Sequence, residues 1–248
     1  MKFEIAIALD RGKTRTGKNQ DYAASARRPW FPSTWAKVAL ADGMGGYQGG
    51  EIASRLVVRQ ILSYFRNHSF DDPNYETYLM EALAQAHQAI KKIAGEKKEL
   101  SAMGSTLSAA VFNQQAAYCI NVGDSRIYHK RGENFVQLSE DQSVVADLVR
   151  KGALNPEEVN THPKRNRLTM SISAKRDVIN PRLYRVDLQE DDHFLFCSDG
   201  VWTVVPLEQM IQTLNVKPVR YAAKILSKLA NQYGGPDNIS VIIVHVKR

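Results

Sequence analysis

The sequence predicts an α+β fold, in which helices cover antiparallel strands, and three observations favour this class. Short strand patterns follow one another between residues 104 and 138 and are joined by tight turns, which is typical of antiparallel strands. Two long patterns, from Ile52 to Phe65 and at about 74–94, have the apolar spacing of amphipathic helices. The 248 residues are 44% hydrophobic and 24% charged, which suits one domain, 1–248, with a sizeable core.

The first hundred residues alternate between strand and helix patterns. Alternating or continuous apolar residues indicate strands, and a run of glycines separates the second strand from the first helix. Asp71-Asp72-Pro73 is predicted to interrupt the chain between the helices. The predicted elements are a strand at 3–9, a polar loop at 10–21, a strand at 35–41, a helix after Gly50, a helix at 74–94 and an exposed charged turn at 95–99.

The remaining residues are rich in short strands separated by glycine and asparagine. Proline in the first turn marks the start of three helices. Residues 161–177 are polar and basic with weak periodicity, so we expect a flap over a site, with His162 as an ordinary loop histidine. The predicted elements are strands at 104–112, 116–122, 126–130 and 135–138, helices at 141–151 and from 155, strands at 182–188 and 193–197, helices from 206 and 218, and a strand at 239–246.

Charge and composition narrow the function classes. The net charge is +7 and the pI about 9.3, but the basic residues are mostly scattered, which favours solvated faces and phosphorylated substrates over nucleic acid. No apolar stretch approaches 18 residues, and the first ten residues resemble a strand rather than a signal peptide. Cys119 and Cys197 lie in apolar strand patterns without metal-binding spacing, so we expect reduced core cysteines in a cytoplasmic protein.

The stretch from Asp42 to Gly50 carries the strongest local signal, a carboxylate at a strand end followed by glycines and a helix. One interpretation is nucleotide binding, but the glycines read GxGxxxG, one residue longer than the dinucleotide fingerprint. The other is a hard cation held by Asp42 and a neighbouring glycine carbonyl. The cation is favoured, because Asp42 would repel a pyrophosphate unless a metal ion lay between them.

Further aspartates occur in similar positions, at strand edges or tight turns beside Gly, Asn or Ser. Each alone can be a helix cap or turn former. Together they would form a costly buried cluster, which two divalent cations would neutralise. Oxygen ligands without paired His or Cys favour Mg²⁺ or Mn²⁺ over zinc. The five aspartates are Asp21, Asp42, Asp124, Asp199 and Asp237.

Five motifs in order resemble those of the protein phosphatase 2C-like (PPM) family of metal-dependent Ser/Thr phosphatases, in its compact bacterial form. The resemblance runs from about residue 4 to 246 and implies an α-β-β-α sandwich of two central antiparallel sheets flanked by helices. The motifs are Asp42-Gly-Met-Gly-Gly46, Gly104-Ser-Thr106, Val122-Gly-Asp124-Ser-Arg126, Ser198-Asp-Gly200 and Gly235-Pro-Asp237-Asn238.

The resemblance also implies roles for single residues and a flap at about 142–178. In the family pattern two metal ions share a bridging carboxylate, a third ion binds more weakly, and an arginine binds phosphate. The implied assignments are Asp42 as the bridge, the Gly43 carbonyl as a ligand, Asp199 and Asp237 at one metal, Asp21 near the second, Asp124 at the third, and Arg15 on the phosphate.

The chain departs from the family pattern at three places. Arg15 and Asn19 are one residue further apart than usual, so Lys13 is an alternative phosphate ligand. Gln20 replaces a frequent glutamate. Met170 and Ser173 replace a common arginine and glycine in the flap. Met44 stands where some relatives have histidine, which leaves the proton donor to the leaving group open.

The implied function is hydrolysis of phosphoserine and phosphothreonine in proteins by water that two Mn²⁺ or Mg²⁺ ions activate. The expected partners are phosphoproteins and a cognate bacterial Ser/Thr kinase, with type VI secretion as one setting. We expect a monomer that binds neither nucleic acid nor membrane. The alternatives are a phosphoprotein-binding pseudophosphatase and hydrolysis of a non-protein phosphomonoester.

Overall fold

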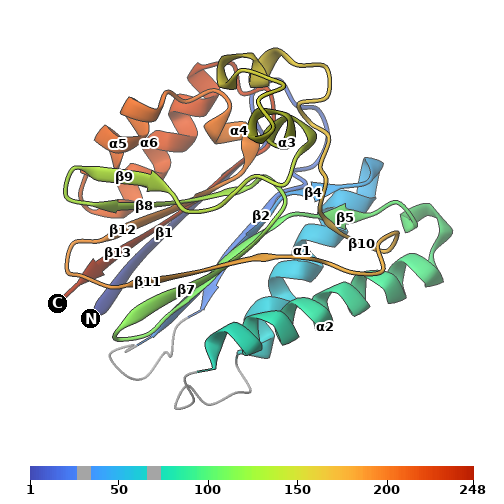
Figure 1. Cartoon of the computed structure of the whole chain (residues 1–248), viewed down its shortest axis with the longest axis horizontal. Coiled ribbons are helices and arrows are strands. Elements are labelled where there is room, and N and C mark those ends of the chain that lie inside the picture. Colours follow the sequence, from blue (N-terminus) through green and yellow to red (C-terminus); the bar gives the residue numbers. More distant parts are fainter. Residues whose placement is uncertain (27–34, 66–73) are drawn as a thin grey trace.

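The chain folds around two antiparallel sheets that face each other (Figure 1). The computed structural model describes residues 1–26, 35–65 and 74–248. Each large sheet has five strands, and all of their pairings are antiparallel, as the sequence predicts. A three-stranded sheet of two-residue strands lies beside them.

The first sheet has the order β1-β13-β12-β8-β9, the second β11-β7-β6-β3-β2, and the small one β10-β5-β4. Their strands, sheet by sheet, are β1 (Lys2–Asp10), β13 (Ile239–Lys247), β12 (His193–Cys197), β8 (Arg126–Arg131) and β9 (Asn134–Gln137); β11 (Arg182–Asp187), β7 (Ala116–Val122), β6 (Leu107–Phe112), β3 (Ala36–Ala41) and β2 (Tyr22–Ala26); β10 (Ile172–Ser173), β5 (Gly104–Ser105) and β4 (Gly43–Met44).

Helices cover the outer face of each large sheet, which completes an α-β-β-α sandwich. Two long helices pack on the second sheet and three on the first, while a short helix lies between β9 and β10 (Figure 1). The helices are α1 (Gly46–Tyr64) and α2 (Tyr75–Glu96); α4 (Asp199–Trp202), α5 (Leu207–Leu214) and α6 (Val219–Gln232); and α3 (Val144–Arg150). None of the helices in the described ranges is long and apolar enough to cross a membrane.

Apolar side chains fill the space between the two large sheets. Phe112 and Phe194 are fully buried there, with ring centroids 5.1 Å apart in an edge-to-face arrangement. Burying a phenylalanine contributes about 1.5–3 kcal/mol. Both cysteines are buried and free, as predicted, and burial raises the pKa of Cys119 and Cys197 to about 12.

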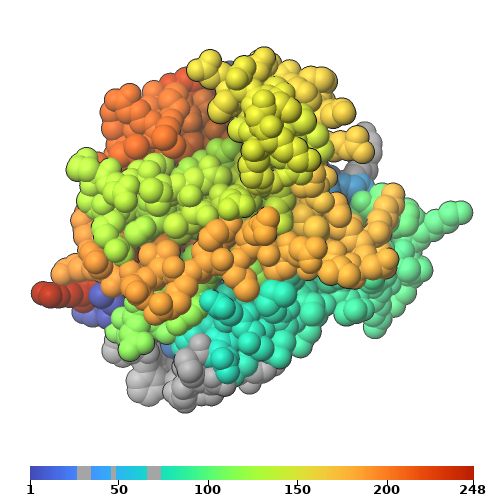
Figure 2. All heavy atoms as spheres, in the orientation of Figure 1, coloured from blue at the N-terminus to red at the C-terminus, as the bar shows by residue number. Residues whose placement is uncertain are grey.

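The segment between β9 and β11 contains residues 142–178, which the sequence predicts to form a flap. It holds α3, a 3₁₀ turn at Pro156–Thr161 and β10. In the space-filling view its first part (yellow) stands at the surface beside the α5–α6 layer (Figure 2). His162 is a half-buried loop residue, and its Nδ1 accepts a hydrogen bond from the Lys164 N–H at 3.1 Å.

Two predictions about strands were wrong or incomplete. Residues 104–112 form two strands in different sheets, because the chain breaks at Thr106, whose N–H donates to the Asp42 carbonyl at 2.9 Å. β2 was not predicted, since its sequence Tyr-Ala-Ala-Ser-Ala has small residues and little apolar contrast.

Helix boundaries also differ from the predictions. The predicted glycine loop contributes its last residues to α1, which begins at Gly46, and α2 runs into the predicted turn as far as Glu96. The segment starting at Asn155 is a 3₁₀ turn with proline in its first turn, and α4 was not predicted. The predicted interruption at Asp71-Asp72-Pro73 lies outside the described residues.

Candidate metal centre

The five predicted aspartates lie at the same end of the two large sheets, where strands end or begin. Each occupies a connection beside a strand, so the sheets fix the backbone that carries it. Asp42 joins β3 to β4, Asp21 precedes β2, Asp124 lies between β7 and β8, Asp199 begins α4 after β12, and Asp237 precedes β13.

Burial and mutual repulsion raise the pKa values of four of these carboxyl groups. Burial, followed by repulsion from Asp21 and Asp199, raises the pKa of Asp42 well above its ordinary value. Burial and repulsion from Asp124 and Asp237 do the same to the pKa of Asp199. Burial raises the pKa of Asp21 to about 6 and that of Asp124 to about 7. The site therefore holds more negative charge than its own groups can neutralise.

Two buried carboxylate oxygens lack hydrogen-bond partners within the described part of the chain, Oδ1 of Asp21 and Oδ1 of Asp199. An unpartnered buried carboxylate oxygen is costly. Asp21 is tied on its other side, because the Ser198 hydroxyl donates to Oδ2 at 2.7 Å. A cluster of oxygen donors with free lone pairs and excess negative charge fits hard divalent cations such as Mg²⁺ and Mn²⁺.

Hydrogen bonds to the backbone hold Asp42 in place. Its N–H donates to Thr106 Oγ1 at 2.9 Å, and its carbonyl accepts from the Ser105 hydroxyl at 2.9 Å. Thr106 Oγ1 also lies 2.8 Å from Ser125 Oγ, beside Asp124. Residues of the Gly104-Ser-Thr106 motif therefore position the candidate bridging carboxylate rather than act as ligands.

Asn238 connects three loops around the same end. Its Oδ1 accepts from the Gln20 N–H at 2.8 Å, and its Nδ2 donates to the Arg11 carbonyl at 2.7 Å. Its carbonyl accepts from the Ser198 hydroxyl at 3.3 Å. The asparagine after Asp237 thus ties the first polar loop to the segment that carries Asp199.

Arg15 lies beside the aspartates, with its Nε 3.2 Å from Asp237 Oδ1. Both residues line a cavity of about 370 Å³ that also contacts Asp199. The flap contributes Arg165 and Asn160 to the same cavity. The sequence indicated a basic flap segment but not which of its residues reaches the site.

Arg126 supports the site from the β8 side. Its Nη2 and Nε donate to the Asp141 carboxylate at 2.7 and 3.0 Å, and its guanidinium lies 3.5 Å from the centroid of the Trp202 ring. The Trp202 indole N–H donates to the Asp124 carbonyl at 3.0 Å. Arg126 therefore links the base of the flap to the backbone of Asp124.

Gly43 permits a close approach that no other residue would allow. A Cβ at this position would lie 2.0 Å from the Gly50 carbonyl oxygen and 2.6 Å from that of Gln20. We expect Gly43→Ala to displace α1 or the end of β3, lowering Mn²⁺-dependent activity at least about 100-fold and stability by about 2 kcal/mol or more. Steady-state hydrolysis and thermal unfolding measure the two effects.

Gly95→Ala is the matched control, because no atom lies within 4 Å of a Cβ there. A helical Gly→Ala change is expected to be neutral or stabilising by about 0.5–1 kcal/mol. Equal activity and stability in the two variants would show that the approach of Gly43 to Gly50 does not shape the site.

Comparison with known proteins gives one consistent family. The family model described as protein phosphatase 2C matches residues 13–233. The protein phosphatase PhpP of Streptococcus pneumoniae is 35% identical over 246 residues, which cover 98% of this chain and 97% of PhpP. The serine/threonine phosphatase stp of Listeria innocua is 34% identical over 210 residues, covering 84% and 83% of the two chains.

Solved structures with the same fold include one that contains metal. The catalytic domain of the phosphatase PstP in complex with two manganese ions has a TM-score of 0.87 and 30% identity over 99% of each chain. PppA of Pseudomonas aeruginosa, described as a key regulatory component of its type VI secretion system, has a TM-score of 0.84 and 27% identity over 98% of this chain and 97% of its own.

Proposed function

Because this chain belongs to the protein phosphatase 2C family and is a metal-dependent serine/threonine phosphatase, we propose that it dephosphorylates proteins through a two-metal site at the aspartate cluster. The observation that carries the proposal is the convergence of buried carboxylates with raised pKa values, two of which leave an oxygen unpartnered within the described residues. The whole chain, 1–248, then forms one catalytic domain.

Different residues of the chain would have different roles in metal binding. We propose that Asp42 bridges two ions, with the Gly43 carbonyl as a further ligand. Asp199 and Asp237 would complete one site, Asp21 would lie near the second, and Asp124 would hold a third, weaker ion. The hydrogen bond from the Asp42 N–H to Thr106 fixes the backbone at Asp42, and the bond from the Ser198 hydroxyl fixes the Asp21 carboxylate, which supports this division.

Arg15 is the proposed phosphate ligand. Its guanidinium faces the cavity that contains Asp199 and Asp237, so it can donate to phosphate oxygens there. Bound divalent cations supply Lewis acidity and activate water for in-line displacement at phosphorus. No thiolate or hydroxyl nucleophile of the protein is needed, which agrees with the burial of both cysteines.

The proposed physiological role is to oppose a bacterial Ser/Thr kinase as a cytoplasmic monomer that binds neither nucleic acid nor membrane. Control of type VI secretion is one setting, and the similarity to PppA supports it. Two alternative functions are compatible with the same fold. One is a pseudophosphatase that only binds phosphoproteins, and the other is an enzyme that hydrolyses a non-protein phosphomonoester.

The test is hydrolysis of an aryl phosphate, a phosphothreonine peptide, a nucleotide and a sugar phosphate, with EDTA, Mg²⁺ and Mn²⁺ in turn, by the native protein and by Arg15→Ala. We expect metal-dependent turnover by the native protein. Loss of the phosphate ligand should raise KM about 10-fold or more with a smaller change in kcat, because the guanidinium binds substrate and transition state alike.

Lys18→Ala is the matched control, since Lys18 lies in the same loop but pairs with Glu51 at 3.2 Å. An unchanged KM in Arg15→Ala would remove Arg15 from phosphate binding. Absence of turnover with every metal would favour the pseudophosphatase, and turnover of nucleotides or sugar phosphates far above the peptide would favour the non-protein substrate.

A further inference from the structure

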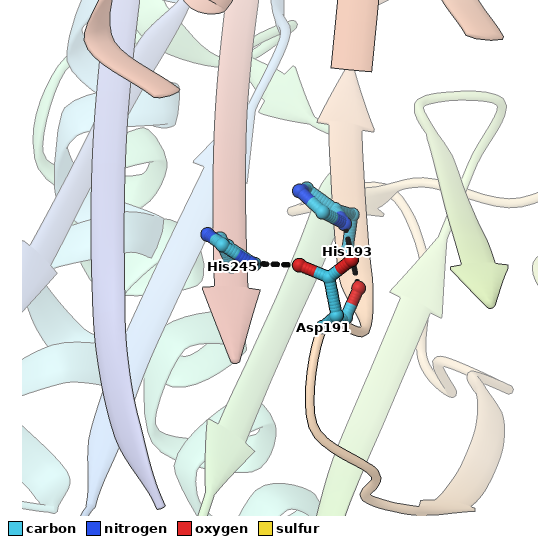
Figure 3. Close-up of side chains that lie close together, drawn as sticks. All are labelled: Asp191, His193 and His245. Atoms are coloured by element: carbon cyan, nitrogen blue, oxygen red, sulfur yellow. Dashed lines mark hydrogen bonds and ion pairs between the residues drawn. The ribbon is translucent and has the colours of Figure 1, made fainter. Parts of the chain in front are cut away.

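A second group of ionisable side chains lies at the end of the first sheet opposite the aspartates. Asp191, His193 and His245 come together where β12 begins and β13 nears its end (Figure 3). His193 and His245 are direct partners in the register of these two strands. From the start of β13 at Ile239 to His245 the strand advances six residues, roughly 20 Å at about 3.3 Å per residue.

The three side chains bring three potential metal ligands close together. The two imidazole rings are nearly parallel, 10° apart in orientation, with centroids separated by 4.1 Å. Asp191 Oδ1 lies 2.7 Å from His245 Nε2, and the Asp191 carbonyl oxygen lies 2.8 Å from His193 Nδ1. One ligand atom of each residue lies within 4.8 Å of the others.

Burial differs across the group in a way that suits an ion entering from solvent. His193 and His245 are only 2% and 3% exposed, whereas the Asp191 side chain is 65% exposed. The carboxylate thus covers two buried imidazoles on their outer side. The strand pairing on both sides of β12 and β13 fixes the backbone that carries the two imidazoles.

The turn that presents Asp191 is itself fixed. Asp191 has a φ of 68°, and its N–H donates to the Val246 carbonyl at 2.9 Å. The next residue, Asp192, is fully buried, and its carboxylate accepts from Arg131 and from the Gln189 N–H at 2.7–2.8 Å. Aspartate tolerates a left-handed backbone better than most residues, and anchored strain of this kind occurs at ligand sites.

The hydrogen bonds leave two ring nitrogens without partners. If His245 Nε2 and His193 Nδ1 donate to Asp191, then Nδ1 of His245 and Nε2 of His193 face inward, and neither has a hydrogen-bond partner among the described residues. The inward nitrogen of His245 lies 3.9 Å from Glu4 Oε2. A metal ion on the Asp191 side would move the His245 proton to this nitrogen, facing Glu4, as in carboxylate–histidine–metal arrangements.

We propose that Asp191, His193 and His245 form a zinc site, separate from the aspartate centre and selective for a different class of metal. Two imidazoles and one carboxylate are ligands that suit Zn²⁺, whereas oxygen-only ligands suit Mg²⁺ and Mn²⁺. The ion would tie the turn before β12 to β13. It would act as a structural clamp about 20 Å from the chemistry.

Lys217 is the competitor for the site. Its Nζ lies 2.9 Å from Asp191 Oδ1, so the ammonium occupies a position that a cation would take. Its side chain is 53% exposed and can swing into solvent. Removing this charge should therefore strengthen zinc binding. If the Lys217–Asp191 pair served only the fold, breaking it would lower the stability of the protein without increasing its affinity for zinc.

The test is a Zn²⁺ titration against a chromophoric chelator, in Mn²⁺ excess, on the native protein, Asp191→Asn, His193→Gln and Lys217→Gln. We expect one more Zn²⁺ per chain in the native protein than in Asp191→Asn. The affinity of this ion should fall at least about 10-fold in His193→Gln and rise in Lys217→Gln. Asparagine tolerates the left-handed backbone, so Asp191→Asn should keep the fold.

Two further measurements make the outcome decisive. His162→Ala, which removes a loop histidine outside the proposed site, should bind as much Zn²⁺ as the native protein. Imidazole ¹⁵N spectra should shift for His193 and His245 on adding Zn²⁺, and Mn²⁺-dependent activity of Asp191→Asn should stay unchanged. Equal zinc counts in the native protein and Asp191→Asn would overturn the proposal, as would a His245 that is doubly protonated and insensitive to Zn²⁺.

Discussion

Replacing Asp199 with asparagine is expected to abolish metal-dependent hydrolysis while stabilising the metal-free protein. The change is isosteric but removes a charge that is buried and repelled by Asp124 and Asp237. A site that holds metal through this carboxylate should lose at least about 10³-fold in kcat/KM. In EDTA the same change should raise the melting temperature by a few degrees, on the order of 1 kcal/mol of relieved repulsion.

Hydrolysis with Mn²⁺ and thermal unfolding in EDTA measure these two effects. Asp177→Asn is the matched control, because Asp177 is an exposed flap residue that pairs only with Lys91 at 3.5 Å in the described structure. It should change neither quantity. An Asp199→Asn variant with native turnover would remove Asp199 from the metal site. A variant that lost turnover and also stability in EDTA would mean that Asp199 supports the fold instead.

The metal-free protein is expected to lose stability as the pH rises from about 4 to about 7. An unfolded aspartate has a pKa of about 3.9. The folded pKa is raised to about 6 for Asp21 and about 7 for Asp124, and upward for Asp42 and Asp199. In this window the folded state binds protons that the unfolded state releases, so each unit of pH weakens folding, by several kcal/mol in total.

Other groups act in the opposite direction but do not reverse this trend. The pKa of His193 is lowered to about 4, so this residue adds stability as the pH rises from about 4 to about 6.5. This single histidine is outweighed by the four aspartates whose pKa values are raised. Below pH 4, Asp192, whose pKa is lowered to about 2 by Arg131 against the effect of burial, loses its contribution as the pH falls. Metal-free stability should therefore be greatest near pH 4–5.

Urea unfolding at pH 4.5, 5.5, 6.5 and 7.5, in EDTA and in saturating Mn²⁺, checks this prediction. Metal requires deprotonated carboxylates, so the stabilisation by Mn²⁺ should grow with pH over the same window. The slope in EDTA should be smaller in Asp199→Asn. A stability that rises between pH 4.5 and 7.5 without metal would contradict the charge coupling described here.

The candidate site could be predicted largely from local sequence. Asp42 and Asp199 each follow a strand pattern and precede glycine within two residues, so chain position alone brings them to a sheet edge. The sequence could not show what holds them. Thr106 accepts from Asp42 across 64 residues, and this long-range bond also splits the predicted strand at 104–112.

Features that depend on strand register were beyond prediction. His193 and His245 are 52 positions apart, and only the pairing of β12 with β13 makes them neighbours. The same holds for Arg165, whose approach to Asp199 depends on how the flap folds back. β2 escaped prediction for a different reason, because small residues carry little periodic signal even when their strand pairs well with β3.

The burial of the two cysteines determines how they react with oxidants. Cys119 and Cys197 are fully buried, and a pKa of about 12 keeps each sulfur protonated at physiological pH. Peroxide and disulfide reagents attack the thiolate, and they need access to it. The folded chain has neither a cysteine thiolate nor a cysteine sulfur that the reagents can reach. Oxidants that inactivate phosphatases with a cysteine nucleophile should therefore leave these two cysteines unmodified.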